Sequence, residues 1–349
     1  MKKVIGLLLI IVLTVTGVWY YFSPAQQLQR LGYSREAAKT LTATLDPEAL
    51  TELRAREYSI EYVDLLTATD FRVENYANYL KALDRNELSV AEIVQLVNHP
   101  DYDENLTYST ELLAILLHEY YISANRERYF AYYDEYRAPI AQVIANVNAN
   151  RDREFYTETA PTNLDDGALM LVNKYFYLSE NYNPDLVPLG ATYGAAGIEI
   201  ALEAKTSFVN LFNAALAAGF RLYATSGYRD YAGQAEVYRT WVATVGENEA
   251  KNYAALPGHS EHQTGLVLDI FVMGETTSTF AQHPAAAWLA EHAAEYGFIL
   301  RYTAEHEALT GYDYEAWHFR YVGQAAATEI TNAHLTLEEY VALKHAGRL

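Results

Sequence analysis

Two short segments in the C-terminal half of the chain set the strongest requirement on its fold. The first carries His262 and Asp269, and the second carries Glu315 and His318. Two neutral imidazoles and one carboxylate are a common ligand set for a catalytic zinc ion, which keeps a further position for water. The metal lowers the pKa of that water to about 7, and a carboxylate that is not a ligand must then collect the proton. We expect the fold to bring these segments together.

The sequence around both segments predicts short strands. The apolar run 266–272 reads as a buried strand with Asp269 on one face, and Gly265 lets the backbone turn or approach a neighbour just before it. The run 317–322 also reads as a strand, which carries His318. A single histidine on an apolar strand is more often a core residue than a ligand. Four such groups in two tight clusters favour a metal site.

The motifs resemble a known family. Ser260-x-His262-x-x-Gly265-x-x-x-Asp269, followed by Glu315-x-Trp317-His318, is similar to the signature of the VanY-type D-alanyl-D-alanine carboxypeptidases. These are zinc peptidases of bacterial cell walls, in a superfamily shared with lysostaphin-like enzymes and Hedgehog domains. The resemblance covers roughly the last half of the chain. Ala316 stands where relatives usually have proline, and Val267 where a small residue is common, but neither change removes a functional group.

The resemblance implies a role for each site residue. Zinc would be held by His262, Asp269 and His318, with Glu315 as the catalytic base. Substrate would be held by Arg229, Gln234, Ser260 and Trp317, and Arg229 would also help to stabilise the oxyanion. Without the resemblance, Arg229 could equally be a surface ion-pair partner and Gln234 a helix cap. His259, beside the ligands, is expected to be a solvated loop histidine.

The N-terminus predicts a membrane anchor or a signal peptide, within residues 1–25. Lys2 and Lys3 precede an apolar run, 4–22, which is about long enough to cross a bilayer as a helix. Its aromatic end resembles an interfacial belt and favours a retained anchor over a cleaved peptide. We therefore expect a single-pass protein of the cell membrane with an extracytoplasmic catalytic domain, secreted if the segment is cleaved.

Composition narrows the possible partners. The formal net charge of −20 excludes nucleic acid as a partner, because its phosphates need a basic surface. The chain has no cysteine, so it has neither disulfides nor a thiolate metal site. The expected cofactor is Zn²⁺, and the expected partners are peptidoglycan stem peptides.

The region 26–150 predicts a helical domain with an internal repeat of about 50 residues. The recurring positions include Asn75, Tyr79 and Asn98, which return as Asn125, Tyr129 and Asn148. A connector, 151–188, leads to a catalytic domain, 189–349. Within these two parts we expect a strand at 169–174, a helix at 198–218, a strand at 222–225, and helices at 234–242, 284–296 and 336–343.

We therefore predict an α+β protein, whose zinc peptidase domain has a small, mainly antiparallel sheet flanked by helices. The sheet is implied by the resemblance more than by periodicity. The expected function is a zinc-dependent D-alanyl-D-alanine carboxypeptidase that trims the C-terminal D-alanine of stem peptides. Two alternatives stay open: an L,D-carboxypeptidase that acts on tetrapeptide stems, and a non-catalytic wall-binding protein with a structural zinc.

Overall fold

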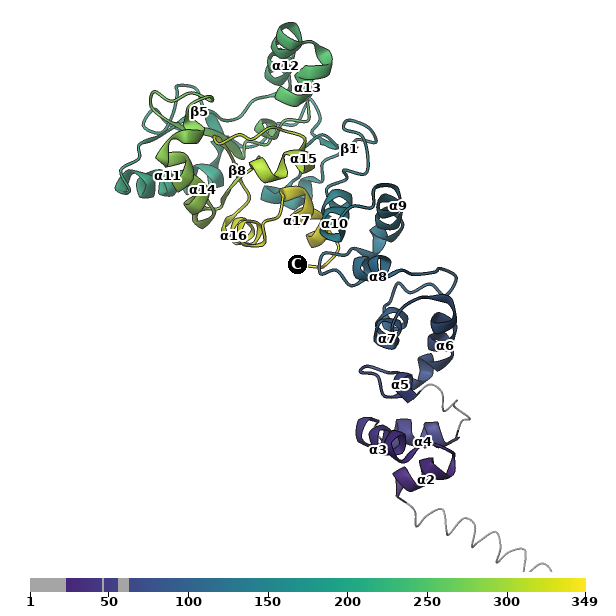
Figure 1. Cartoon of the computed structure of the whole chain (residues 1–349). Helices are drawn as coiled ribbons and strands as arrows, with labels where there is room; N and C mark the ends of the chain where they lie inside the picture. The colour runs from purple at the N-terminus through teal and green to yellow at the C-terminus, as the bar shows by residue number, and fades with distance from the viewer. Residues whose placement is uncertain (1–22, 46, 56–62) are drawn as a thin grey trace, which may run out of the picture. The chain divides into compact units, whose positions relative to one another are not determined.

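The computed structural model describes residues 23–45, 47–55 and 63–349 (Figure 1). They form two compact units, one that ends at Glu119 and one that runs from Tyr120 to Leu349. The division falls inside the second sequence repeat. The boundaries at 150 and 188, which come from the sequence, stay predictions.

The described part of the first unit consists of short helices, several of which begin at capping residues. The helices are α2 (Pro24–Arg30), α3 (Arg35–Thr44), α4 (Pro47–Ala55), α5 (Val63–Leu66), α6 (Tyr76–Arg85), α7 (Val90–Asn98) and α8 (Thr110–Leu116). Ser34 caps α3 by accepting a hydrogen bond from the N–H of Ala37, and Ser89 forms a full capping box on α7 with Glu92. These caps satisfy N–H groups that a helix start leaves without partners.

A polar contact recurs at the positions of the internal repeat, which stays a prediction. In the first unit the Tyr79 hydroxyl donates to Asn98 Oδ1 at 2.6 Å, and in the second unit the Tyr129 hydroxyl donates to Asn148 Oδ1. Each asparagine also donates to a backbone carbonyl. The second pair connects α9 (Arg126–Tyr136) to α10 (Ile140–Asn148) as the first connects α6 to α7. The repeated letters therefore mark buried and partly buried polar groups that need partners.

A four-stranded antiparallel sheet forms the centre of the second unit, as expected (Figure 1). Its strand order is β5-β6-β8-β7, and the strands are β5 (Leu222–Ser226), β6 (Val267–Val272), β7 (Phe298–Leu300) and β8 (His318–Tyr321). The core of the sheet includes apolar residues of α11 (Leu202–Ala217) and α14 (Pro284–His292). The register places Asp269 of β6 opposite His318 of β8 and opposite Ser226 of β5.

Four short strands lie outside this sheet. They are β1 (Ala160–Pro161), β2 (Phe176–Tyr177), β3 (Leu186–Pro188) and β4 (Glu199–Ala201), in two pairs. The predicted strand 169–174 is wrong: a 3₁₀ helix, η4, covers Leu164–Leu169, and the Asn173 side chain accepts from the N–H groups of Tyr175 and Phe176, which turns the chain. The predicted helix 198–218 begins later, at Leu202, because residues 199–201 pair with β3.

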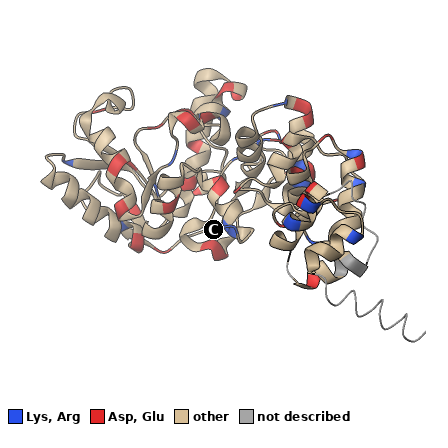
Figure 2. Ribbon diagram, turned by 60° about the horizontal axis from the view of Figure 1, so that its bottom comes forward, with Lys and Arg blue, Asp and Glu red and all other residues tan. Residues whose placement is uncertain are grey.

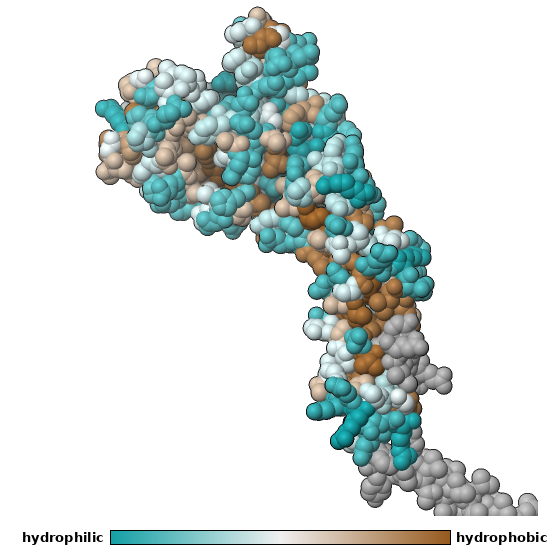
Figure 3. Space-filling view, in the orientation of Figure 1, coloured by the Kyte–Doolittle hydropathy of each residue, from teal (hydrophilic) through white to brown (hydrophobic). Residues whose placement is uncertain are grey.

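The remaining helices surround the sheet or project from it. They are α12 (Tyr231–Val245), α13 (Glu247–Tyr253), α15 (Glu307–Thr310), α16 (Gln324–Ala333) and α17 (Leu337–His345). Helices α12 and α13 pack against each other, and Figure 3 shows a small apolar patch at their tip with hydrophilic side chains on one side of it. Thr336 caps α17 in a capping box, which confirms the helix predicted there. The helix predicted at 284–296 is α14 followed by a 3₁₀ helix, η7 (Ala293–Tyr296), which Gly297 ends at φ +83.

Acidic side chains dominate the charge of the molecule. Figure 2 shows them spread over the helices around the sheet, with few basic side chains between them. This distribution matches the net charge of −20.

The prediction of a single-pass membrane protein needs correction. The apolar run on which it rests lies outside the described residues. Among the helices that are described, none is both long and apolar enough to cross a membrane: α11 has 16 residues, whereas a span needs about 20 apolar ones. The single-pass assignment is therefore not supported, and we withdraw it.

Candidate metal site and substrate cleft

Three elements carry the predicted ligands to one place. His262 lies in a 3₁₀ turn, η5 (Glu261–Thr264), Asp269 in the middle of β6, and His318 at the start of β8. Gly265 ends the turn at φ +73, and a Cβ atom there would lie 2.7 Å from Leu186 Cδ2. Both the turn and the close approach expected of this glycine are therefore present.

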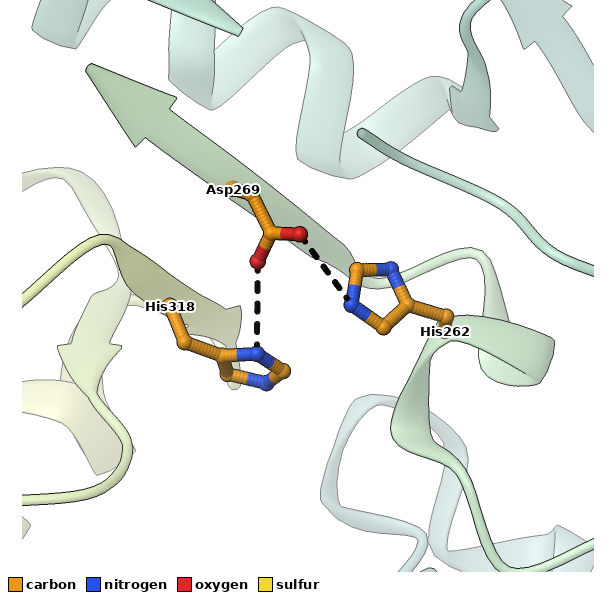
Figure 4. Close-up of side chains that lie close together, drawn as sticks. All are labelled: His262, Asp269 and His318. Atoms are coloured by element: carbon orange, nitrogen blue, oxygen red, sulfur yellow. Dashed lines mark ion pairs between the residues drawn. The ribbon is translucent and has the colours of Figure 1, made fainter. Parts of the chain in front are cut away.

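The ligand atoms have the spacing of a tetrahedral zinc site. Asp269 Oδ2 lies 3.5 Å from His262 Nε2, and Asp269 Oδ1 lies 3.4 Å from His318 Nδ1 (Figure 4). All three donor groups lie within 4.8 Å of one another. Tetrahedral bonds of roughly 2.0–2.1 Å would separate ligands by about 3.3 Å. Asp269 Oδ1 is buried without a hydrogen-bond partner among the described residues, so the donor set fits zinc.

The two histidines present different nitrogens to the site. His262 Nδ1 lies 2.7 Å from the carbonyl oxygen of Gly227, so its N–H donates there and Nε2 is left free to bind a metal ion. His318 is turned the other way. Its Nδ1 faces Asp269 and Glu315, and its Nε2 lies 3.5 Å from Glu261 Oε2.

Burial and nearby charge give His262 and Asp269 the protonation states in which each can bind a cation. Burial lowers the pKa of His262 to about 4, so this imidazole is neutral at pH 7. Burial alone would raise the pKa of Asp269, but His262, His318 and Arg229 together hold it below its usual value. A neutral imidazole and an ionised carboxylate are the protonation states that zinc requires.

His318 stands among carboxylates. Burial would lower its pKa, yet Asp269, Glu261 and Glu315 raise it well above its usual value. The negative charge that favours a proton on this ring favours a metal cation in the same place. Glu315 Oε2 lies 3.3 Å from His318 Nδ1, and its side chain is 24% exposed. Glu315 is thus beside the ligand atoms and open to solvent.

All eight predicted site residues line one cleft of about 220 Å³. They are Arg229, Gln234, Ser260, His262, Asp269, Glu315, Trp317 and His318. The segments that carry them are far apart in the sequence, and antiparallel pairing of β5, β6 and β8 brings them together.

Arg229 and Gln234 are held by each other. Arg229 donates from one terminal nitrogen to Gln234 Oε1 at 2.8 Å and from the other to Ser226 Oγ at 3.1 Å. Gln234 donates to the carbonyl of Ala255 at 2.8 Å. The residue that caps α12 is Asp230, so Gln234 is not a helix cap. Burial lowers the pKa of Arg229, while Asp269 and Glu315 oppose that shift.

Several cleft residues escaped prediction. His259 was expected to be solvated, but its ring is half-buried, lines the cleft, and has Nδ1 2.7 Å from the carbonyl oxygen of Asn173. Tyr302 and Tyr312 also line the cleft, with ring centroids 4.8 Å apart. Glu261 is buried behind His318. Only the position of Glu261 between Ser260 and His262 could have drawn attention to it.

Known proteins share this half of the chain. A family model described as "VanY: D-alanyl-D-alanine carboxypeptidase" matches residues 197–324. The putative carboxypeptidase YodJ of Bacillus subtilis is 41% identical over 183 residues, which are 50% of this chain and 67% of that protein. The bifunctional D-Ala-D-Ala dipeptidase and D-Ala-D-Ala carboxypeptidase VanXYC of Enterococcus gallinarum is 35% identical over 49% of this chain and 92% of its own length.

A solved carboxypeptidase structure is also similar to about half of this chain. The LdcB LD-carboxypeptidase superposes with a TM-score of 0.50 at 38% identity, over 53% of this chain and 90% of that one. The residues that match the family model contain the four-stranded sheet and the site. The chain belongs to the VanY family of D-alanyl-D-alanine carboxypeptidases, which are zinc metallopeptidases.

Proposed function

We propose that the chain removes the C-terminal D-alanine from peptidoglycan stem peptides by zinc-dependent hydrolysis. Family membership supports the reaction class. The observation that carries the proposal is the single cleft in which three metal ligands, a non-ligand carboxylate and a buried arginine meet. An enzyme of this kind needs all of these groups, whereas a structural zinc needs only the ligands.

His262, Asp269 and His318 would hold the zinc ion. Bound there, zinc acts as a Lewis acid and lowers the pKa of coordinated water to about 7. Glu315 takes the proton that the attacking water loses and passes it to the departing amine. Its position 3.3 Å from His318 Nδ1, with part of its side chain exposed, supports this role.

Arg229 would recognise the free carboxylate of the chain end or the developing oxyanion. Gln234 and Ser226 fix its two terminal nitrogens, and each of these nitrogens keeps one further N–H for a ligand. A guanidinium held in this way can donate two parallel hydrogen bonds to a carboxylate. Ser260 and Trp317 would form part of the wall against which the peptide lies.

The test is Glu315→Gln in the complete chain. We expect zinc content to stay unchanged and kcat on a D-Ala-D-Ala pentapeptide to fall by at least about a hundredfold, since the amide cannot accept the proton. Glu305→Gln, at an exposed glutamate of the neighbouring 304–306 turn, is the matched control and should cleave normally. A Glu315→Gln protein as fast as its parent would rule out the proposed base and favour a structural zinc.

The likeness to an LD-carboxypeptidase supports a second candidate specificity, for tetrapeptide stems. Tetrapeptide and pentapeptide stems differ in the residue before the scissile bond. The side chains that line the cleft must distinguish the two residues. Mass spectrometry of both peptides after incubation with the protein decides between them. Our proposal predicts that D-alanine is lost from the pentapeptide faster than from the tetrapeptide, and the reverse order would reassign the activity.

A further inference from the structure

Glu261 is a buried carboxylate next to a metal ligand with one oxygen unused. Its side chain is fully buried, and Oε2 has no hydrogen-bond partner among the described residues. The nearest polar atom that the structure pairs with Oε2 is Nε2 of His318, 3.5 Å away. That nitrogen is likewise buried without a partner in the described part of the chain. Two orphaned groups of complementary chemistry thus face each other.

The other oxygen of Glu261 is fully engaged. Oε1 accepts from Nε of Arg301 at 2.8 Å and from a terminal nitrogen of Arg320 at 3.2 Å. Arg301 in turn donates two hydrogen bonds to Glu338 of α17, at 2.6 and 3.0 Å. Arg320 also donates to the backbone carbonyls of Ala168 and Met170. Two guanidinium groups therefore hold the Glu261 carboxylate in place.

The ring of His318 needs such a partner. Neutral imidazole carries its proton on one nitrogen, and only the other can bind zinc. Without an acceptor on the Nε2 side, the proton would move to Nδ1 and be donated to Asp269 or Glu315, which lie 3.4 and 3.3 Å away. That tautomer blocks the nitrogen that faces the metal site.

We propose that Glu261 is a positioning residue for the metal site: its Oε2 accepts the Nε2 proton of His318 and so keeps Nδ1 free to bind zinc. This inference rests on the metal site of the proposed function. The competing role for Glu261 is charge balance alone, because two arginines also need an anion. The two roles can be told apart because only the positioning role needs Oε2 of Glu261 as a hydrogen-bond acceptor.

Zinc affinity tests the proposal without turnover. Loss of such an outer carboxylate costs roughly 10–100-fold in metal affinity. We expect Glu261→Gln to raise the zinc Kd by that factor, measured by competition with a chromophoric chelator. Glu338→Gln is the matched control: it removes one carboxylate from the same buried network but does not face His318. It should change the zinc Kd by less than about threefold.

Nitrogen NMR of the zinc-loaded protein reads the tautomer directly. The parent should show a proton on Nε2 of His318 and on Nδ1 of His262. In Glu261→Gln the His318 signal should shift and exchange faster, while the His262 signal stays as it is. Because Glu261→Gln removes a counter-charge from two buried arginines, the double variant Glu261→Gln/Arg320→Met, compared with Arg320→Met alone, repeats the test with charges balanced.

An unchanged zinc Kd and an unchanged His318 signal in Glu261→Gln would overturn the proposal. An equal loss of zinc affinity in Glu338→Gln would show that Glu261 acts only as a counter-charge for the arginines. A parent protein that binds zinc but releases no D-alanine would defeat the proposed function and leave the role of Glu261 intact.

Discussion

Replacing Gly227 with alanine should weaken zinc binding, although Gly227 is not a ligand. Its carbonyl oxygen is the acceptor that orients His262, at 2.7 Å from Nδ1. A Cβ atom at this position would lie 2.7 Å from the carbonyl oxygen of Glu199 and 2.7 Å from Cγ2 of Ile198. Glu199 belongs to β4, whose pairing with β3 limits its retreat, so the Gly227 backbone must move instead.

The size of the effect follows from these contacts. Real contacts of a Cβ atom are rarely shorter than 3.0 Å, so the backbone must shift by several tenths of an ångström. Overpacking of this kind costs about 1–3 kcal/mol of stability, which for a unit of this size lowers Tm by roughly 2–4 °C per kcal/mol. The displaced carbonyl no longer holds the His262 ring, and loss of such a partner weakens metal binding by about 10–100-fold.

Gly194→Ala supplies the matched control. Its Cβ atom would meet the Ala224 carbonyl oxygen at 2.6 Å and Ala224 Cβ at 2.9 Å, a similar clash that falls against strand β5 and away from the carbonyl that accepts from His262. Calorimetry should show a lower Tm for both variants, and chelator competition should show a higher zinc Kd for Gly227→Ala alone. If both variants keep the parent's zinc Kd, or both lose affinity equally, the Gly227 carbonyl does not orient the ligand.

Three further outcomes are expected. A chelator should abolish activity and zinc should restore it; activity in protein with a metal content of nil would contradict a metallopeptidase. Arg229→Lys should lose more than about tenfold in kcat/KM with zinc content unchanged, because a point charge cannot replace the guanidinium fork. Arg320→Lys should instead lower Tm, since the Arg320 side chain is fully buried. Loss of kcat/KM in Arg320→Lys but not in Arg229→Lys would place the substrate at Arg320. Burial lowers the pKa of Lys174 from 10.5 to about 8, so the unfolded chain binds more protons between these values and stability should rise with pH by about 3 kcal/mol across that window. Urea unfolding at pH 7.5 and 10 should show this rise in the parent and its loss in Lys174→Met, and an identical pH response in both would refute it.

The chemistry of the candidate site could be predicted because it depends on residue identity and short spacing. Imidazole and carboxylate groups within two short motifs specify a zinc ligand set, and alternating apolar residues around Asp269 and His318 specify strands. The helix ends at Ser34, Gly297 and Thr336 were equally readable, since capping is local. The predicted repeat could be read because each copy pairs a buried tyrosine hydroxyl with an asparagine side chain.

Other features required the folded chain. The segment 169–174 looks like a strand by hydropathy, but the Asn173 side chain turns it, and 199–201 left the predicted helix because a partner strand was available. His259 is half-buried and contacts a carbonyl 86 positions away in the sequence. The role inferred for Glu261 depends on its contacts with Arg301, Arg320 and His318. The role of Gly227 depends on its contacts with Glu199 and His262. Local pattern names the groups that can do chemistry, whereas tertiary packing decides which atoms of those groups are left free, because burial and hydrogen-bond partners are set by residues distant along the chain.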